Sequence, residues 1–168
     1  MKFNPLLLAL IGFSIFCPVN GTAENNQLKL FKTGSYRQIL ETHKNQPFVL
    51  IIWSLTCSSC LKDMENLDTL HKNNPRLELV MLSTDELSDT ENIEAMLEQH
   101  HLADVENWVF ADENTQKLRF EIDPSWYGEM PKTYFFDKHH HRTGVSGVLS
   151  KQEFSEHVAK ITDNNGNP

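Results

Sequence analysis

The chain has 168 residues, which is the length of a single domain with room for a short leader. Its 23 acidic side chains outnumber the 15 Lys and Arg side chains, and the formal net charge is −8. An acidic chain of this kind has no electrostatic footprint for nucleic acid or anionic lipid, so we expect no nucleic-acid partner.

The N-terminus has the pattern of a secretory signal peptide. Lys2 is followed by an apolar run over residues 6–16, which is too short to span a bilayer. Gly21 and Ala23 supply the small residues of a cleavage site, so we predict cleavage after Ala23 and export to the periplasm. Lipidation at Cys17 and an uncleaved membrane anchor are the less favoured alternatives.

The rest of the chain is predicted to form one domain. Because no internal repeat, flexible linker or long charge run divides it, we assign residues 1–23 to the signal peptide, 24–162 to the domain and 163–168 to a disordered tail. Removal of the leader would leave only two cysteines, Cys57 and Cys60.

Hydrophobic periodicity predicts alternating strands and helices in the first half of the domain. The elements are an edge strand at 28–31, a helix at 35–43, a strand at 48–53, a helix from the second cysteine to about residue 70, and a strand at 77–82. The strand at 48–53 is an apolar run without alternation, as expected of a central strand covered on both faces. The order of strand, helix and strand predicts a right-handed parallel crossover.

The second half of the domain continues the same alternation. Its predicted elements are a helix at 88–101, a strand at 108–111, a helix at 115–122, a strand at 133–136, an antiparallel strand at 143–149 and a helix at 150–161. Three capping boxes are predicted to open helices, namely Ser35 with Gln38, Ser88 with Glu91 and Ser150 with Glu153. The predicted fold class is therefore α/β, with a central mixed sheet flanked by helices.

Cys57 and Cys60 stand in a Cys-Ser-Ser-Cys motif between the central strand and the helix that follows it. A helix N-terminus presents unpaired N–H groups and the positive end of the helix dipole, and both favour an anion. For a thiol the anion is the reactive thiolate, so the pattern indicates thiol chemistry at Cys57. A structural staple is disfavoured because two cysteines this close enclose a very short loop.

These features resemble the thioredoxin-like superfamily, and more closely its exported TlpA-type thiol-disulfide oxidoreductases, over about residues 30–161. The stretch IIWSLTCSSC is similar to the family's strand and active-site motif, with Trp53 on the first Trp of that motif. The stretch MPKTYFFD is similar to the family's cis-proline and the strand after it, with Pro131 as the proline. The helix and strand predicted within residues 88–111 match the insertion that sets the TlpA type apart.

The resemblance implies an enzyme in which Cys57 is the nucleophile and Cys60 the resolving thiol, without a metal or an organic cofactor. Asp63 either accepts the Cys60 proton or is a solvated carboxylate of the first helical turn, and both readings stay open. A cis bond before the proline would leave the backbone of residue 130 free to pair with an extended substrate. The predicted supporting residues are Asp63, Pro131 and Trp53, and the predicted substrate-binding residues are Met130, Pro131, Trp126 and Tyr127.

The implied partners are protein thiols or disulfides of the cell envelope and a membrane reductase or oxidase, and we expect a monomer. Reduction of the partner is the preferred direction, since no His stands between the cysteines to stabilise a thiolate strongly. Thr56 stands where the family usually has a Trp, and Ser58 and Ser59 form an unfamiliar dipeptide, so the direction does not follow from the resemblance.

The alternative is a binding module in which the same fold holds a metal ion or a partner and the cysteines do not turn over. A Cys-x-x-Cys pair is half of many zinc sites, but structural zinc takes four ligands and the sequence has no second pair. The run His139-His140-His141 is expected to be a solvated turn of the final hairpin, and we expect no metal site.

Overall fold

The computed structural model describes residues 27–163, so the predicted signal peptide and nearly all of the predicted tail lie outside the described residues. The elements in chain order are β1 (Lys29–Phe31), α1 (Ser35–Thr42), β2 (Phe48–Trp53), α2 (Ser58–Asn73), β3 (Glu78–Ser83), the short 3₁₀ helix η1 (Leu87–Asp89), α3 (Thr90–Gln99), β4 (Glu106–Phe110), α4 (Thr115–Ile122), β5 (Lys132–Phe136), β6 (Arg142–Ser146) and α5 (Lys151–Thr162). Every predicted strand and helix is present, with bounds shifted by a few residues. Between residues 27 and 163 no helix is long and apolar enough to cross a membrane.

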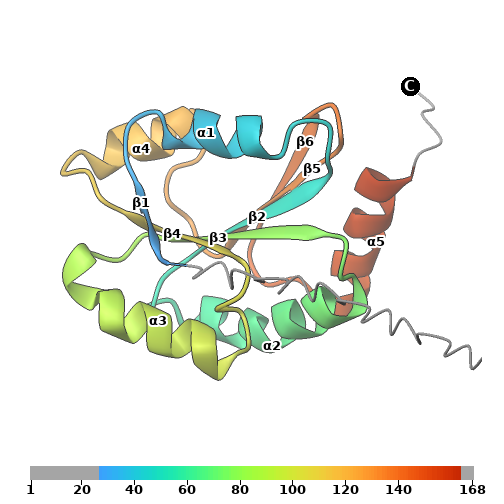
Figure 1. The fold of residues 1–168 in the computed structure, drawn as a ribbon, viewed down its shortest axis with the longest axis horizontal. Coiled ribbons are helices and arrows are strands. Elements are labelled where there is room, and N and C mark those ends of the chain that lie inside the picture. The colour runs from blue at the N-terminus through green and yellow to red at the C-terminus, as the bar shows by residue number, and fades with distance from the viewer. Residues whose placement is uncertain (1–26, 164–168) are drawn as a thin grey trace, which may run out of the picture.

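The strands form one mixed sheet in the order β1-β4-β3-β2-β5-β6. The first four strands in that order are parallel, whereas β5 and β6 are antiparallel to their neighbours. Helices α1 and α4 cover one face of the sheet, and α2 and α3 cover the other face, with α5 beside α2 (Figure 1). The predicted fold class is confirmed, including the additional helix and strand, α3 and β4, between β3 and α4.

The protein has two hydrophobic cores, one on each face of the sheet, and strand β2 contributes to both. Its alternate side chains point to opposite faces. Val49, Ile51 and Trp53 pack in the core beneath α2, α3 and α5. Their neighbours Phe48, Leu50 and Ile52 pack in the core beneath α1 and α4. All six side chains are buried, which explains why the sequence of this strand does not alternate.

The strand register brings three chain segments together at one edge of the sheet, the edge formed by the carboxyl ends of the parallel strands β2 and β3. Trp53, the last residue of β2, pairs with Ser83 at the end of β3. On the other side of β2, Ile52 pairs with Lys132 at the start of β5. The segment after Trp53 therefore leaves the sheet between the end of β3 and the chain that enters β5.

Two of the three predicted capping boxes are wrong. Helix α1 begins after Gly34, which takes a left-handed φ of 91°, and the Ser35 hydroxyl accepts a hydrogen bond from the Lys32 N–H instead of capping the helix. Ser88 lies within η1, so the helix that follows begins two residues later, without a side-chain cap. The box of Ser150 and Glu153 is confirmed, with both reciprocal hydrogen bonds present.

Ser150→Ala should lower the free energy of unfolding by about 1 kcal/mol, because it removes the hydroxyl that accepts from the Glu153 N–H. Ser88→Ala is the matched control and should change it by less than about 0.5 kcal/mol, since Ser88 is exposed and caps no helix. Urea unfolding of the oxidised proteins measures both values. Equal effects of the two substitutions would contradict the assignment.

Candidate redox site

The two cysteines lie where β2 gives way to α2, as predicted. A turn closed by the Cys57 N–H and the Ser54 carbonyl oxygen, 3.1 Å apart, connects the two elements. Cys57 is the N-cap of α2, and its Sγ accepts a hydrogen bond from the Cys60 N–H at 3.1 Å. The sulfur thus takes the place that a serine or aspartate oxygen has in most helix caps.

The cysteines form a disulfide, with Sγ atoms 2.13 Å apart and Cα atoms 5.2 Å apart. Cys60 is only 2% exposed, whereas Cys57 is half-buried. Cys57 is therefore the more accessible of the two residues to a reagent or partner. This difference suits an attacking thiol at Cys57 and a resolving thiol at Cys60.

Asp63 lies one helical turn beyond Cys60 and is 3% exposed, so it is not the solvated carboxylate of one of the two readings. Burial raises the pKa of Asp63 to about 6, although hydrogen bonds from the Leu149 backbone and the Asn66 side chain oppose the rise. Its Oδ1 has no hydrogen-bond partner among the residues described. The group can therefore hold or release a proton near neutral pH inside the helix layer that contains Cys60.

The peptide bond between Met130 and Pro131 is cis, as the resemblance implied, and Pro131 is buried. Because Lys132 pairs with Ile52, this bond lies at the same sheet edge as the cysteine turn. Met130 is half-buried, and the Thr84 hydroxyl lies 3.4 Å from its Sδ. The structure thus brings Met130 and Pro131 to the edge that carries Cys57.

The two predicted aromatic residues, Trp126 and Tyr127, are neighbours in the loop before Met130 but differ in exposure. Trp126 is 4% exposed, and its indole N–H donates to the Glu129 carbonyl oxygen at 2.9 Å, so it supports the loop and offers little surface. Tyr127 is 91% exposed. Of the two, only Tyr127 is available for contact with a partner.

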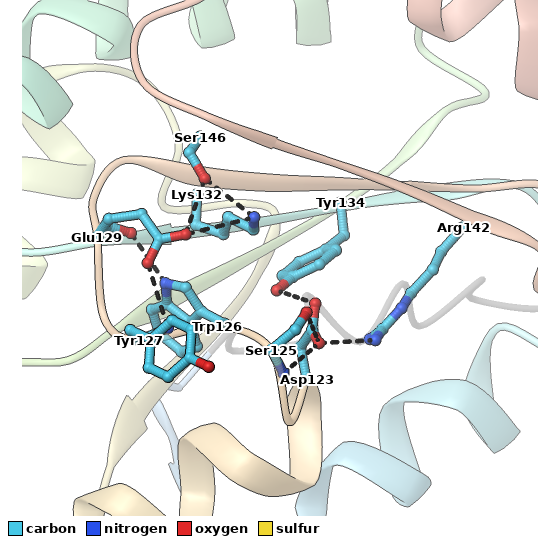
Figure 2. Close-up of polar contacts among 9 residues, drawn as sticks. All are labelled: Asp123, Ser125, Trp126, Tyr127, Glu129, Lys132, Tyr134, Arg142 and Ser146. Carbon is cyan, nitrogen blue, oxygen red and sulfur yellow. Dashed lines mark hydrogen bonds and ion pairs between the residues drawn. The ribbon is translucent and has the colours of Figure 1, made fainter.

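Both ends of this loop are fixed to the β5–β6 hairpin (Figure 2). At one end Asp123 accepts a hydrogen bond from the Tyr134 hydroxyl at 2.9 Å and pairs with Arg142 at 3.4 Å. At the other end Glu129 accepts from the Ser146 hydroxyl at 3.0 Å and pairs with Lys132 at 3.7 Å. The exposed tip therefore projects from a fixed base.

Neither Trp53 nor the histidine run presents an exposed side chain beside Cys57. Trp53 is 1% exposed and packs in the same core as Cys60, so it supports the site from beneath. In the histidine run, His139 and His141 are exposed, whereas His140 packs edge-on against Phe48 at the sheet edge opposite the cysteines. No cluster of three or more His, Cys, Asp or Glu within residues 27–163 has a metal-binding arrangement.

Sequence reasoning missed one carboxylate of the site, Asp85. It follows β3 and accepts hydrogen bonds from the turn that leads to Cys57. Its signal was present in the sequence, because polar residues directly after a buried parallel strand gather at the sheet edge where functional groups lie.

The chain has a thioredoxin-like fold that carries a disulfide-bonded Cys-x-x-Cys pair at a helix N-terminus. Similar solved structures include a secreted Mycobacterium tuberculosis disulfide oxidoreductase homologous to Escherichia coli DsbE, with 19% identity, 72% of this chain and 86% of that chain covered, and a TM-score of 0.58. A secreted thiol-disulfide isomerase from Corynebacterium glutamicum has 14% identity, coverage of 74% and 75%, and a TM-score of 0.62. A thioredoxin-family thiol:disulfide interchange protein from Chlorobium tepidum has 14% identity, coverage of 73% and 83%, and a TM-score of 0.60. Neither a protein-family model nor a curated protein matches this sequence.

The buried Asp63 should make stability depend on pH. Its pKa rises from 3.8 to about 6 on folding, so the folded protein binds more protons than the unfolded chain between these values. Stability is therefore lost as the pH rises through this window, by about 3 kcal/mol in total, and stays lower above it.

Asp63→Asn should abolish this part of the pH dependence, so that the loss of stability between pH 4 and pH 8 becomes smaller than in the wild-type protein. Glu65→Gln removes an exposed carboxylate of the same helix and should leave the dependence unchanged. Urea unfolding of the oxidised proteins across this pH range measures the effect. Parallel curves for wild type and Asp63→Asn would show that the carboxyl titrates normally.

Proposed function

We propose that the protein is a thiol-disulfide oxidoreductase that acts on protein partners. The observation that carries the proposal is the contrast between two bonded sulfurs at one helix N-terminus, of which Cys57 is reachable and Cys60 is buried. A metal- or partner-binding module is the alternative. The arrangement favours exchange, because the described residues place no further ligands around the two sulfurs that would complete a metal site.

The reaction begins from the reduced protein. The Cys57 thiolate attacks one sulfur of a partner disulfide, a mixed disulfide forms, and the released partner thiolate takes up a proton. Cys60 then loses its proton and attacks the Cys57 sulfur, which frees the second partner thiolate. The partner gains two electrons, and the protein is left with the Cys57–Cys60 disulfide. Asp63 is proposed to accept the Cys60 proton, since it lies in the same buried helix layer and its pKa of about 6 suits a base at neutral pH.

The partner is proposed to bind along the edge that holds Met130 and Pro131. An extended segment would pair with the Met130 backbone beside Cys57, as an added strand does. Tyr127 would supply an aromatic contact from the exposed loop tip, and Trp126 would hold that loop in place. Recognition of this kind depends on backbone pairing and apolar contact more than on charge.

The finer proposal is an exported enzyme of the TlpA type that works as a reductant in the cell envelope, as a monomer recharged by a membrane reductase. Support comes from the predicted signal peptide, from the secreted proteins among the similar structures, and from the additional α3–β4 unit. No metal or organic cofactor is needed for the exchange itself.

Reduced wild-type protein should reduce the disulfides of insulin, and Cys57→Ser should abolish this activity because it removes the attacking sulfur. Cys60→Ser should retain the first step and accumulate a mixed disulfide, since the resolving thiol is missing. Turbidity of the precipitating insulin chain and mass spectrometry of the intact protein measure the two outcomes. An inactive wild-type protein that holds stoichiometric zinc or copper would favour the binding module instead.

The reduction potential of the cysteine pair should lie below about −200 mV, because no cationic side chain stands between the cysteines to stabilise the thiolate form. Ser59→His should raise the potential by about 30 mV or more, through the charge of the imidazolium beside the sulfurs. Ser58→Ala serves as the uncharged control. Equilibration with glutathione buffers measures all three potentials, and a wild-type value near −120 mV would reverse the proposed direction.

A further inference from the structure

Asp85 is the first charged residue after β3, and both of its carboxylate oxygens hold the turn that leads to Cys57. Its Oδ1 accepts from the Ser54 hydroxyl at 2.7 Å, and its Oδ2 accepts from the Leu55 N–H at 2.9 Å. The Ser83 hydroxyl also donates to Oδ2 at 2.7 Å. Hydrogen bonds to an ionised group are about twice as strong as neutral ones, so this is a firm anchor.

The anchor controls the whole turn between β2 and α2. Since Ser54 donates its hydroxyl proton to Asp85, its oxygen is oriented to accept from the Thr56 N–H at 3.1 Å. The Ser54 carbonyl oxygen accepts from the Cys57 N–H at 3.1 Å. The N–H groups of three successive residues, Leu55, Thr56 and Cys57, are therefore bound by Asp85 or by the residue that Asp85 orients.

The same segment also touches the other half of the site. The Thr84 N–H donates to the Trp53 carbonyl oxygen at 3.0 Å, and the Thr84 hydroxyl lies 3.4 Å from the Met130 sulfur. The chain after β3 thus contacts both the turn that carries Cys57 and the residue before Pro131. It therefore connects the end of β2 with the residue before the cis-proline.

We propose that Asp85 is a positioning residue for the thiol chemistry, which holds the Ser54–Cys57 turn so that Cys57 remains the N-cap of α2. This inference rests on the proposed thiol-disulfide function, and the hydrogen bonds that Asp85 accepts come from Ser54, Leu55 and Ser83 and not from a cysteine. The charge of Asp85 and its hydrogen bonds have opposite effects on the ionisation of the Cys57 thiol. A nearby negative charge disfavours the thiolate, whereas a fixed N-cap position favours it.

The opposite signs make the two effects separable in a single measurement. In the Cys60→Ser background, alkylation of Cys57 by iodoacetamide reports the pH at which half of the thiol is ionised. Asp85→Asn should raise this midpoint by about one pH unit and slow alkylation at pH 7 about tenfold, because the amide cannot accept all three hydrogen bonds. A role of charge alone predicts a lower midpoint instead.

Two variants complete the experiment. Glu86→Gln removes the adjacent, exposed carboxylate and should leave the midpoint unchanged or slightly lower. Asp85→Glu keeps the charge but displaces the oxygens, so it should resemble Asp85→Asn and not the wild type. An Asp85→Asn midpoint at or below the wild-type value would overturn the proposal.

Ser54→Ala keeps the proposal testable if Asp85→Asn does not fold. It deletes the hydroxyl that donates to Asp85 and accepts from the Thr56 N–H, without changing the charge, and it should raise the midpoint in the same direction by a smaller amount. An unchanged midpoint in a folded Ser54→Ala protein would also overturn the proposal. Because iodoacetamide needs no protein partner, this result is independent of whether the wild-type protein reduces insulin.

Discussion

The site depends on one hydrogen bond, from the Cys60 N–H to the Cys57 sulfur. Every helix begins with N–H groups that lack partners within the helix, and here the first of the two cysteines supplies the acceptor. The same contact therefore completes the helix and favours negative charge on the sulfur. Burial of β2 on both faces makes this arrangement possible, since a strand that packs in two cores has its end held in one position.

Much of this arrangement could be predicted from local sequence. The unalternating apolar run of β2, the cysteines at the helix start and the cap at Ser150 each leave a signal within a few residues, and the structure has all three. The capping boxes at Ser35 and Ser88 failed for a physical reason. A serine three residues before Gln or Glu caps a helix only if the chain enters there in an extended conformation, and at these positions it turns.

The sequence places Asp63 in a helix and Asp85 directly after a buried strand, but the roles of both side chains come from contacts between distant segments. Burial of Asp63 comes from packing against the chain before α5, and nothing within its own helix distinguishes it from a solvated carboxylate. Asp85 gains its role from the pairing of β2 with β3, which places the ends of two strands side by side. In both cases the tertiary neighbours, and not the local pattern, decide what the side chain does.

In the loop between Asp123 and Glu129, the two ends are held by contacts with the sheet and the tip is exposed. Its two ends are tied to β5 and β6 by ion pairs and hydrogen bonds, while Tyr127 at its tip is almost fully exposed. Residues at the tip can therefore be exchanged at little cost in folding free energy, because the backbone course is set at the base. If Tyr127 contacts the partner, as proposed, substitutions at this tip would change partner choice while the cysteines, the sheet and the helix layers stay the same.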